Sequence, residues 1–201
     1  MIRLVLADDE SLTRGAVGTL LGLEPDLAVV GEAATGDEAV ASIRAHRPDV
    51  AVLDVEMPGR DGAEVAKWVA ANEPGVRCII LTRHARPGVL RRALAAGAAG
   101  FVTKSAPASV LADVIRRVHR GGRYVDPDLA MTALMAEECP LTDRELEVLR
   151  NVEASGTAAD IAGRVHLSPG TVRNYLSSAM QKLGASTRAE AAQHARDNGW
   201  L

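Results

Sequence analysis

The alternation of short apolar runs with helical patterns constrains the fold of this chain more than any other feature. Over the first 120 residues, five apolar runs alternate with five segments whose apolar residues recur at helical spacing. The runs are Ile2–Ala7, Leu27–Gly31, Val50–Leu53, Val76–Leu81 and Gly100–Thr103, and the helical segments are Leu12–Leu23, Gly36–Ala45, Gly62–Ala71, Pro87–Ala96 and Pro107–His119. Runs buried on both faces and joined by helical crossovers are typical of parallel sheets. The pattern predicts an α/β domain with a five-stranded, parallel, doubly wound sheet.

The remainder of the chain is predicted to be a linker and an all-α domain. Gly121-Gly122 and an acidic stretch with a possible helix over Leu129–Ala136 interrupt the alternation. From Leu141 the pattern is helical only, and four helix starts are marked by Thr142 with Glu145, Thr157, Ser168-Pro169 and Thr187. The short turn between the second and third helices has helix-turn-helix spacing. We expect domains over residues 1–120 and 139–201, with a linker over 121–138.

The charge distribution points to a polyanion-binding surface in the second domain. The net charge is only −3, but residues 161–189 contain no Asp or Glu and hold Arg164, Arg173, Lys182 and Arg188. Aromatic residues make up 2% of the chain, too few for a base-stacking sheet, so nucleic acid would be bound by a helix in a groove. A four-helix bundle with a solvated basic face is the alternative, although it does not explain why acids are absent from this stretch.

The sequence also narrows the cellular setting. No window approaches the roughly 18 to 20 apolar residues of a membrane span, and the apolar start is too short for a signal peptide. Cys78 and Cys139 are too few for a disulfide framework or a four-ligand zinc site, and we expect each to be a reduced, packed thiol. These features predict a cytoplasmic protein without direct membrane contact.

Polar residues end four of the predicted strands. Asp8 and Asp9 follow the first strand, Asp54 the third, Thr82 the fourth and Lys104 the fifth. In a doubly wound sheet, the binding crevice lies outside the carboxyl ends of the strands, so these side chains should meet. Clustered carboxylates repel one another unless a cation is present, and Mg²⁺ prefers oxygen ligands. A metal ion beside a lysine and a hydroxyl group suits a phosphoryl group.

These residues resemble the receiver domain of two-component response regulators. The resemblance rests on Asp8-Asp9, on Asp54 to Gly59 with Asp61-Gly62, on Thr82, and on Phe101 to Lys104. It implies a flavodoxin-like fold in which Asp54 accepts a phosphoryl group from a sensor histidine kinase. Mg²⁺ would be held by Asp9, Asp54 and the backbone carbonyl of Glu56, with Asp8 helping through water. Lys104 would pair with the acyl phosphate, Thr82 would bind a phosphoryl oxygen, and Phe101 would move inward.

The only chemistry implied for this site is phosphoryl transfer to Asp54 and its later hydrolysis, so we expect no other enzymatic activity. Glu56 and His84 would flank the phosphoryl group, and we hypothesise that they tune its lifetime by steering water. Ser105 stands where many receivers carry proline. We therefore expect no cis-proline after Lys104.

The helical domain is similar to the DNA-binding domain of the NarL/LuxR family. The similarity rests on Leu141 to Leu149, Asp160 to Ala162, Leu167 to Leu176, and Lys182 to Gly184. It implies that the third helix lies in the major groove. Arg173 would contact guanine and Asn174 a base or phosphate, Thr171, Tyr175 and Lys182 would contact the DNA backbone, and Ser177 and Ser178 lie on the same polar face. Arg173 to Tyr175 and the Gly199-Trp200-Leu201 ending most resemble the DesR subgroup.

Together the two resemblances imply a transcription factor that dimerises on phosphorylation and binds double-stranded promoter DNA. The receiver could dimerise through its first and fifth helices or through its fourth helix, fifth strand and fifth helix; the apolar stretch from Ala16 to Leu21 favours the first. Two other classes remain open. An aspartyl-phosphate phosphatase would need a second acid as a general acid, which Glu56 only loosely imitates. A phosphorylation-independent adaptor would bind its partner without change at Asp54.

Overall fold

The computed structural model describes residues 1–83, 87–134, 139–152 and 157–201. The chain divides into two compact units that separate along the sequence near Thr132, and each is described by itself. His84, expected to flank the phosphoryl group, lies outside the described residues. The linker predicted over 121–138 also falls partly outside them.

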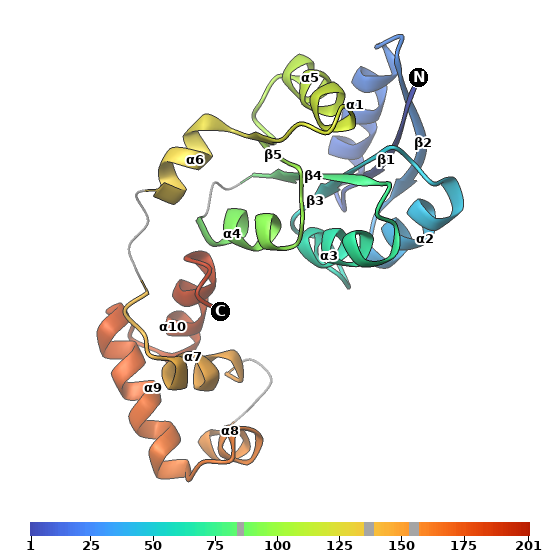
Figure 1. The fold of residues 1–201 in the computed structure, drawn as a ribbon. Helices are drawn as coiled ribbons and strands as arrows, with labels where there is room; N and C mark the ends of the chain where they lie inside the picture. The colour runs from blue at the N-terminus through green and yellow to red at the C-terminus, as the bar shows by residue number, and fades with distance from the viewer. Residues whose placement is uncertain (84–86, 135–138, 153–156) are drawn as a thin grey trace. The chain divides into compact units, whose positions relative to one another are not determined.

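The first unit is built on a parallel sheet with strand order β2-β1-β3-β4-β5-β6 (Figure 1). The strands are β1 (Ile2–Ala7), β2 (Leu27–Ala33), β3 (Val50–Asp54), β4 (Arg77–Thr82), β5 (Gly100–Thr103) and β6 (Tyr124–Val125). Each neighbouring pair is parallel, and the order reverses between β1 and β3. This is the doubly wound topology that the sequence predicts.

The sheet has six strands where five are predicted. The extra strand is Tyr124–Val125, which pairs with Gly100 and Phe101 of β5. Gly121 adopts a φ of +86°, a left-handed conformation that glycine tolerates, and helps the chain turn from α5 into this edge strand. Two residues are too few to show a strand period, so the sequence pattern of this segment indicated only a linker.

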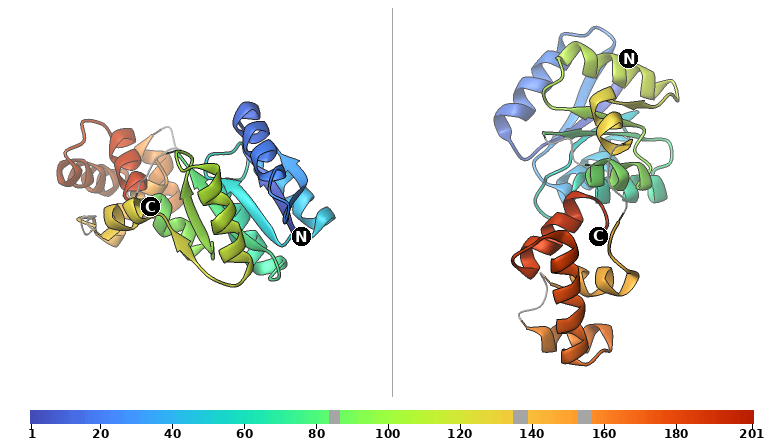
Figure 2. Two further views of the ribbon diagram at one scale, coloured as in Figure 1. Left: turned by 90° about the horizontal axis from the view of Figure 1, so that it is seen from above. Right: turned by 90° about the vertical axis from the view of Figure 1, so that its left-hand side faces the viewer.

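Helices cover both faces of the sheet (Figures 1 and 2). They are α1 (Ser11–Gly22), α2 (Gly36–His46), α3 (Gly62–Asn72), α4 (Pro87–Ala95) and α5 (Ala108–His119), and α6 (Pro127–Leu134) follows the sheet. Residues of α1 and α5, such as Leu21 and Ile115, pack into one core cluster with Leu6, Val52 and Leu81 of the sheet. The alternate residues of β3 face the opposite layer and are equally buried. Burial on both faces explains why these strands read as continuous apolar runs.

Gly62 is required where the chain leaves β3 and returns to begin α3. Its amide donates to the carbonyl oxygen of Val55 at 3.1 Å. A Cβ atom at this position would lie 2.1 Å from the backbone oxygen of Asp54. The loop after Asp54 can therefore pack this closely only with glycine at position 62.

We expect Gly62→Ala to destabilise the first unit by about 1 to 3 kcal/mol, because the backbone of β3 must shift to admit a methyl group. The loss is measured by urea unfolding followed through the fluorescence of Trp68, which lies in this unit. Gly15→Ala is the matched control, since nothing lies within 4 Å of a Cβ at Gly15 in α1. A Gly62→Ala variant as stable as Gly15→Ala would contradict the crowding argument.

The second unit contains α7 (Asp143–Arg150), α8 (Ala158–Val165), α9 (Pro169–Leu183) and α10 (Arg188–Asp197). The four predicted N-caps are confirmed: Thr142, Thr157, Ser168 and Thr187 each accept a hydrogen bond from the backbone amide three residues on. Thr142 and Glu145 form the predicted capping box. Apolar side chains from all four helices, among them Val148, Ile161, Leu176 and Ala192, form one core.

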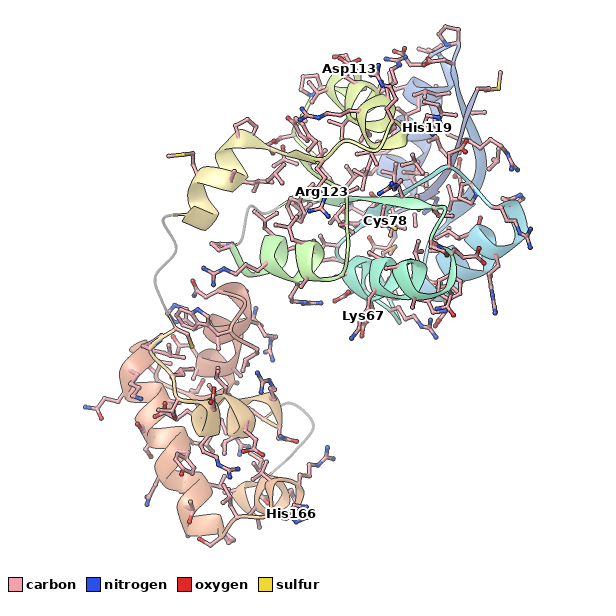
Figure 3. The ribbon with its side chains drawn as sticks, viewed as in Figure 1. Lys67, Cys78, Asp113, His119, Arg123 and His166 are labelled. Atoms are coloured by element: carbon pink, nitrogen blue, oxygen red, sulfur yellow. The ribbon has the colours of Figure 1, made fainter. Side chains whose placement is uncertain are left out.

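The two cysteines differ in their surroundings. Cys78 is buried in β4 (Figure 3), and burial raises the pKa of its thiol to about 12. Cys139 is exposed, so the expectation of a packed thiol is wrong for this residue. Cys139 precedes the helices of the second unit, whereas Cys78 lies in a strand. Nothing in the sequence around Cys139 distinguishes an exposed thiol from a packed one. Among the described residues, no helix combines the length and the apolar character that crossing a bilayer needs.

Candidate functional site

Three carboxylates meet at the carboxyl edge of the sheet, as the sequence predicts. Asp8 follows β1 and Asp54 ends β3, and both side chains are buried, whereas Asp9 is exposed. One carboxylate oxygen from each residue lies within 4.8 Å of the other two. Asp8 also accepts a hydrogen bond from the amide of Glu10 at 2.9 Å, which holds the turn after β1 against the sheet. The arrangement offers hard oxygen ligands from two adjacent strands.

Lys104 bridges the two buried carboxylates. Its Nζ lies 2.8 Å from Oδ2 of Asp54 and 2.8 Å from Oδ2 of Asp8. Burial raises the pKa of Asp54 and outweighs the opposing effect of Lys104. Burial alone would lower the pKa of Lys104, but its contacts with Asp54 and Asp8 raise it. A buried ammonium group beside Asp54 is placed to neutralise negative charge that arises there.

Thr82 and Phe101 lie beside this pair on β4 and β5. Thr82 is buried, pairs with Thr103, and accepts a hydrogen bond from the amide of Lys104 at its carbonyl oxygen, 2.7 Å away. The side chain of Phe101 is fully buried. It therefore already occupies an inward position in this structure. Glu56, two residues after the end of β3, lines a cavity together with Asp54 and Thr82.

Two charged residues, Glu10 and Arg83, also line the pocket. The cavity, of about 220 Å³, is lined by Asp9, Glu10, Asp54, Glu56, Thr82, Arg83 and Lys104. Arg83 forms an ion pair with Glu10, and Glu10 also lies 3.9 Å from Nζ of Lys104. Both residues directly follow predicted site residues in the sequence, which is a usable signal. Adjacency does not reveal that their side chains meet.

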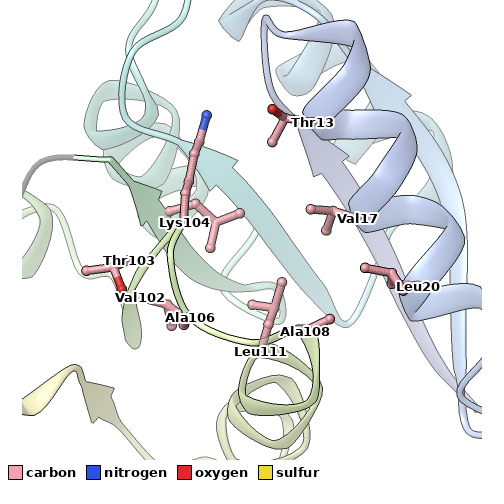
Figure 4. A pocket seen from close by; sticks show the side chains of 10 residues that line it. Thr13, Val17, Leu20, Val102, Thr103, Lys104, Ala106, Ala108 and Leu111 are labelled. Atoms are coloured by element: carbon pink, nitrogen blue, oxygen red, sulfur yellow. The ribbon is translucent and has the colours of Figure 1, made fainter.

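A second cavity, of about 150 Å³, adjoins the acidic pocket. It lies between α1 and the segment that joins β5 to α5 (Figure 4). Thr13, Val17 and Leu20 of α1 face Ala106 and Leu111 across it, and Lys104 lies at one end. The cavity is mainly apolar, so it offers packing surface rather than ligands for a metal.

The third helix of the second unit, α9, presents a polar face. Arg173, Asn174 and Ser177 are exposed, whereas Val172, Leu176 and Leu183 lie in the core. Tyr175 is half-buried against the core, and the hydroxyl of Thr171 lies 2.8 Å from that of Ser168. Ser168 and Pro169 begin the helix as predicted. The exposed residues therefore lie near its N-terminal half, the part of a recognition helix that contacts base edges.

Ser178 and Lys182 of α9 are bound to a buried carboxylate. Glu145 of α7 accepts hydrogen bonds from Oγ of Ser178 at 2.6 Å, from Nζ of Lys182 at 2.8 Å and from the backbone amide of Thr142 at 2.7 Å. Burial alone would raise the pKa of Glu145, but these donors outweigh it and lower the pKa to about 2. The sequence predicts Ser178 and Lys182 at the DNA, and that contact stays a prediction. The structure shows their polar atoms fixing α9 to α7.

Comparison with known proteins agrees with the two expected domain types. Residues 4–116 match the family model of the response regulator receiver domain, and residues 139–195 match that of bacterial regulatory proteins of the luxR family. The chain is 44% identical to the uncharacterized transcriptional regulatory protein YvfU and 42% identical to the transcriptional regulatory protein DesR, both of Bacillus subtilis. Each alignment spans 201 residues and covers 100% of both chains.

Solved structures show the same architecture. The response regulator ChrA of a heme-sensing two-component system aligns with a TM-score of 0.60 at 32% identity, over 100% of this chain and 98% of that one. A complex of the two-component response regulator RcsB with DNA aligns with a TM-score of 0.69 at 22% identity, over 98% of each chain, a likeness that shows the fold. With both domain models and full-length relatives in agreement, the chain belongs to the NarL/LuxR family of DNA-binding two-component response regulators and is similar to DesR.

Proposed function

We propose that Asp54 is the phosphoacceptor of this regulator and that a sensor histidine kinase phosphorylates it. The observation that carries this assignment is the contact of Asp54 with Lys104 at 2.8 Å in a buried pocket. In the transfer, an oxygen of Asp54 bonds to phosphorus, and the bond from phosphorus to the donor nitrogen breaks. Lys104 then pairs with the acyl phosphate, and the hydroxyl of Thr82 binds a phosphoryl oxygen. Phe101 occupies the inward position next to them.

Mg²⁺ fits the residues of this pocket. The carboxylates of Asp8, Asp9 and Asp54 converge, so oxygen ligands of the kind that Mg²⁺ prefers lie together at this edge of the sheet. Asp9, Asp54 and the carbonyl of Glu56 would hold the ion, and Asp8 would assist through water. The bound ion would offset charge on the transferring phosphoryl oxygens. The role of Glu56 and His84 in the lifetime of the phosphoryl group remains a hypothesis.

The assignment of Asp54 is tested with a small phosphoryl donor in place of the kinase. Acetyl phosphate with Mg²⁺ should add one phosphoryl group to the chain, as measured by intact mass, and peptide mapping should place it on Asp54. A chelator should prevent the addition. Asp113→Asn is the control variant, because that carboxylate lies on α5 (Figure 3) with 78% of its side chain exposed. A chain that remains unmodified would contradict the assignment, and sustained hydrolysis of phosphoester substrates would favour a phosphatase.

We propose further that α9 is the recognition helix and that phosphorylation promotes a dimer that binds two DNA half-sites. A dimer places two recognition helices on paired half-sites about one helical turn apart. The solved RcsB relatives include two dimers bound to two parallel DNAs, which supports this arrangement. Arg173 and Asn174 would contact bases, with Thr171, Tyr175, Ser177, Ser178 and Lys182 at or near the DNA backbone. The protein would act in the cytoplasm, where chromosomal DNA lies.

We expect Arg173→Ala to weaken binding to the preferred site by about 1 to 3 kcal/mol, because a bidentate contact to guanine is lost. Fluorescence anisotropy with a duplex selected by the wild-type protein from a random library measures this loss. Binding to an unrelated duplex should weaken less. Arg150→Ala controls for the change of charge, since Arg150 is exposed on α7. Equal losses on both duplexes would show that Arg173 contacts only phosphate.

A further inference from the structure

An ion pair between Arg83 and Glu10 lies at the acidic pocket. Arg83 directly follows β4, Glu10 directly precedes α1, and their side chains contact each other. Both residues line the same cavity as Asp54. The pair therefore joins two loops that border the phosphoacceptor pocket.

One oxygen of Glu10 collects all of these contacts. Its Oε2 accepts a hydrogen bond from the hydroxyl of Thr13 at 3.0 Å, contacts Arg83, and lies 3.9 Å from Nζ of Lys104. The same lysine nitrogen lies 2.8 Å from Asp54. The guanidinium group of Arg83 is thus held by an oxygen of Glu10 that lies close to Lys104, the lysine that contacts Asp54. Thr13 can keep Glu10 in place when Arg83 leaves.

The pair is suited to exchange because it is exposed. The side chain of Arg83 is 54% exposed and that of Glu10 is 39% exposed. Water competes for such a pair, and exposed ion pairs contribute little to stability. A phosphoryl group on Asp54 would add negative charge and several acceptor oxygens to the same cavity. Arginine binds such oxygens through two parallel hydrogen bonds, which are stronger than contacts with a single carboxylate oxygen.

We propose that Arg83 is a second cationic ligand for the phosphoryl group on Asp54, and that Glu10 holds it aside until that group arrives. This rests on the proposed function of Asp54. In the unphosphorylated protein, Arg83 neutralises Glu10. In the phosphorylated protein, it moves to the phosphoryl oxygens on the side away from Lys104, and Glu10 keeps its hydrogen bond from Thr13. Arg83 thereby stabilises the phosphorylated state. Its contact with Glu10 must be broken first, so Glu10 reduces the net stabilisation.

Beryllofluoride with Mg²⁺ tests this proposal at equilibrium, because it binds to a carboxylate oxygen as a tetrahedral mimic of a phosphoryl group. The full-length wild type is titrated beside Arg83→Ala, Arg83→Lys, Glu10→Gln and the Glu10→Gln/Arg83→Ala double variant. Arg83→Ala should raise the dissociation constant about tenfold, or 1.4 kcal/mol. Arg83→Lys should lie between, because an ammonium group lacks the planar fork. Glu10→Gln should lower the dissociation constant about threefold, since Arg83 is released.

The double variant separates exchange from general electrostatics. If Glu10 acts by holding Arg83, Glu10→Gln has no effect in the Arg83→Ala background. An equal effect of Glu10→Gln in both backgrounds would mean that Glu10 merely repels the anion. An unchanged dissociation constant for Arg83→Ala would mean that Arg83 stays on Glu10. Either result overturns the proposal. Arg77→Ala, exposed at the other end of β4, controls for the loss of positive charge. If wild type and Asp54→Asn bind beryllofluoride equally, the proposed function of Asp54 fails instead.

Discussion

Replacing Asp54 by asparagine should abolish phosphoryl labelling by acetyl phosphate and the dimerisation that follows it. The amide has no carboxylate oxygen with which to form an acyl phosphate. The substitution also removes the negative charge at position 54 that faces Lys104, while the contact of Lys104 with Asp8 at 2.8 Å remains. Intact mass and size-exclusion chromatography with light scattering measure the two effects.

The Asp54→Asn variant is informative because we expect it to stay folded. Asp54 is a buried carboxylate whose pKa is raised by burial, so a neutral amide at this position costs less to bury than the ionised form. The melting temperature should therefore lie within a few degrees of the wild type, which excludes unfolding as the cause of lost labelling. Labelling that persists in a folded Asp54→Asn variant would show that another residue accepts the phosphoryl group.

Replacing Glu145 by alanine should destabilise the second unit by about 3 to 5 kcal/mol. Glu145 is buried and receives hydrogen bonds from Thr142, Ser178 and Lys182, so its removal deprives these three donors of their shared acceptor and leaves a gap between α7 and α9. The loss of stability is measured by chemical unfolding, followed through the fluorescence of Trp200, which packs in this unit. Trp68 of the first unit is replaced by phenylalanine in all variants, so that Trp200 alone reports. Glu147→Ala is the matched control, because the side chain of Glu147 forms an exposed pair with Arg144 and should contribute less than about 1 kcal/mol.

Glu145 should also make the stability of the second unit depend on pH. The pKa of Glu145 falls from its usual 4.5 to about 2 in the folded protein. The folded state therefore favours the ionised form, and its contribution of about 3 kcal/mol is fully present above pH 4.5. It is lost as the pH falls from 4.5 towards 2, when the folded protein also becomes protonated. Glu145→Gln should flatten the stability profile in this window. A wild-type profile as flat as that of the variant would contradict the assignment.

The sequence predicts the sheet well because its signals are local. The runs Ile2–Ala7 and Gly100–Thr103 match β1 and β5 at both ends, since strands buried on both faces are continuously apolar. The caps Thr142 and Ser168 are equally local, because the side chain bonds to an amide three residues away. Strand β6 was missed because its two residues are defined by pairing with β5, a contact distant in sequence.

In the candidate site, too, features set by local sequence could be predicted, and contacts distant in sequence could not. Residues that end strands could be assigned to one pocket, because parallel strands bring their carboxyl ends to one edge. The partners of Glu145 and of Glu10 could not, because Lys182 and Arg83 reach them across 37 and 73 residues. Lys182 has the sequence of a DNA contact and the surroundings of a structural ion pair. The packing of α9 on α7 reveals the ion pair, and the contact of Lys182 with DNA stays a prediction.

A chemical change at Asp54 is expected to alter DNA binding by a separate unit. The most direct test is the affinity of the full-length protein for a selected duplex, measured by fluorescence anisotropy with and without acetyl phosphate and Mg²⁺, together with its mass in solution. We predict that the donor strengthens binding at least tenfold and converts the protein to a dimer, and that Asp54→Asn responds in neither way. Affinity and mass that do not change in a labelled wild-type protein would contradict the account and indicate an adaptor that is independent of phosphorylation.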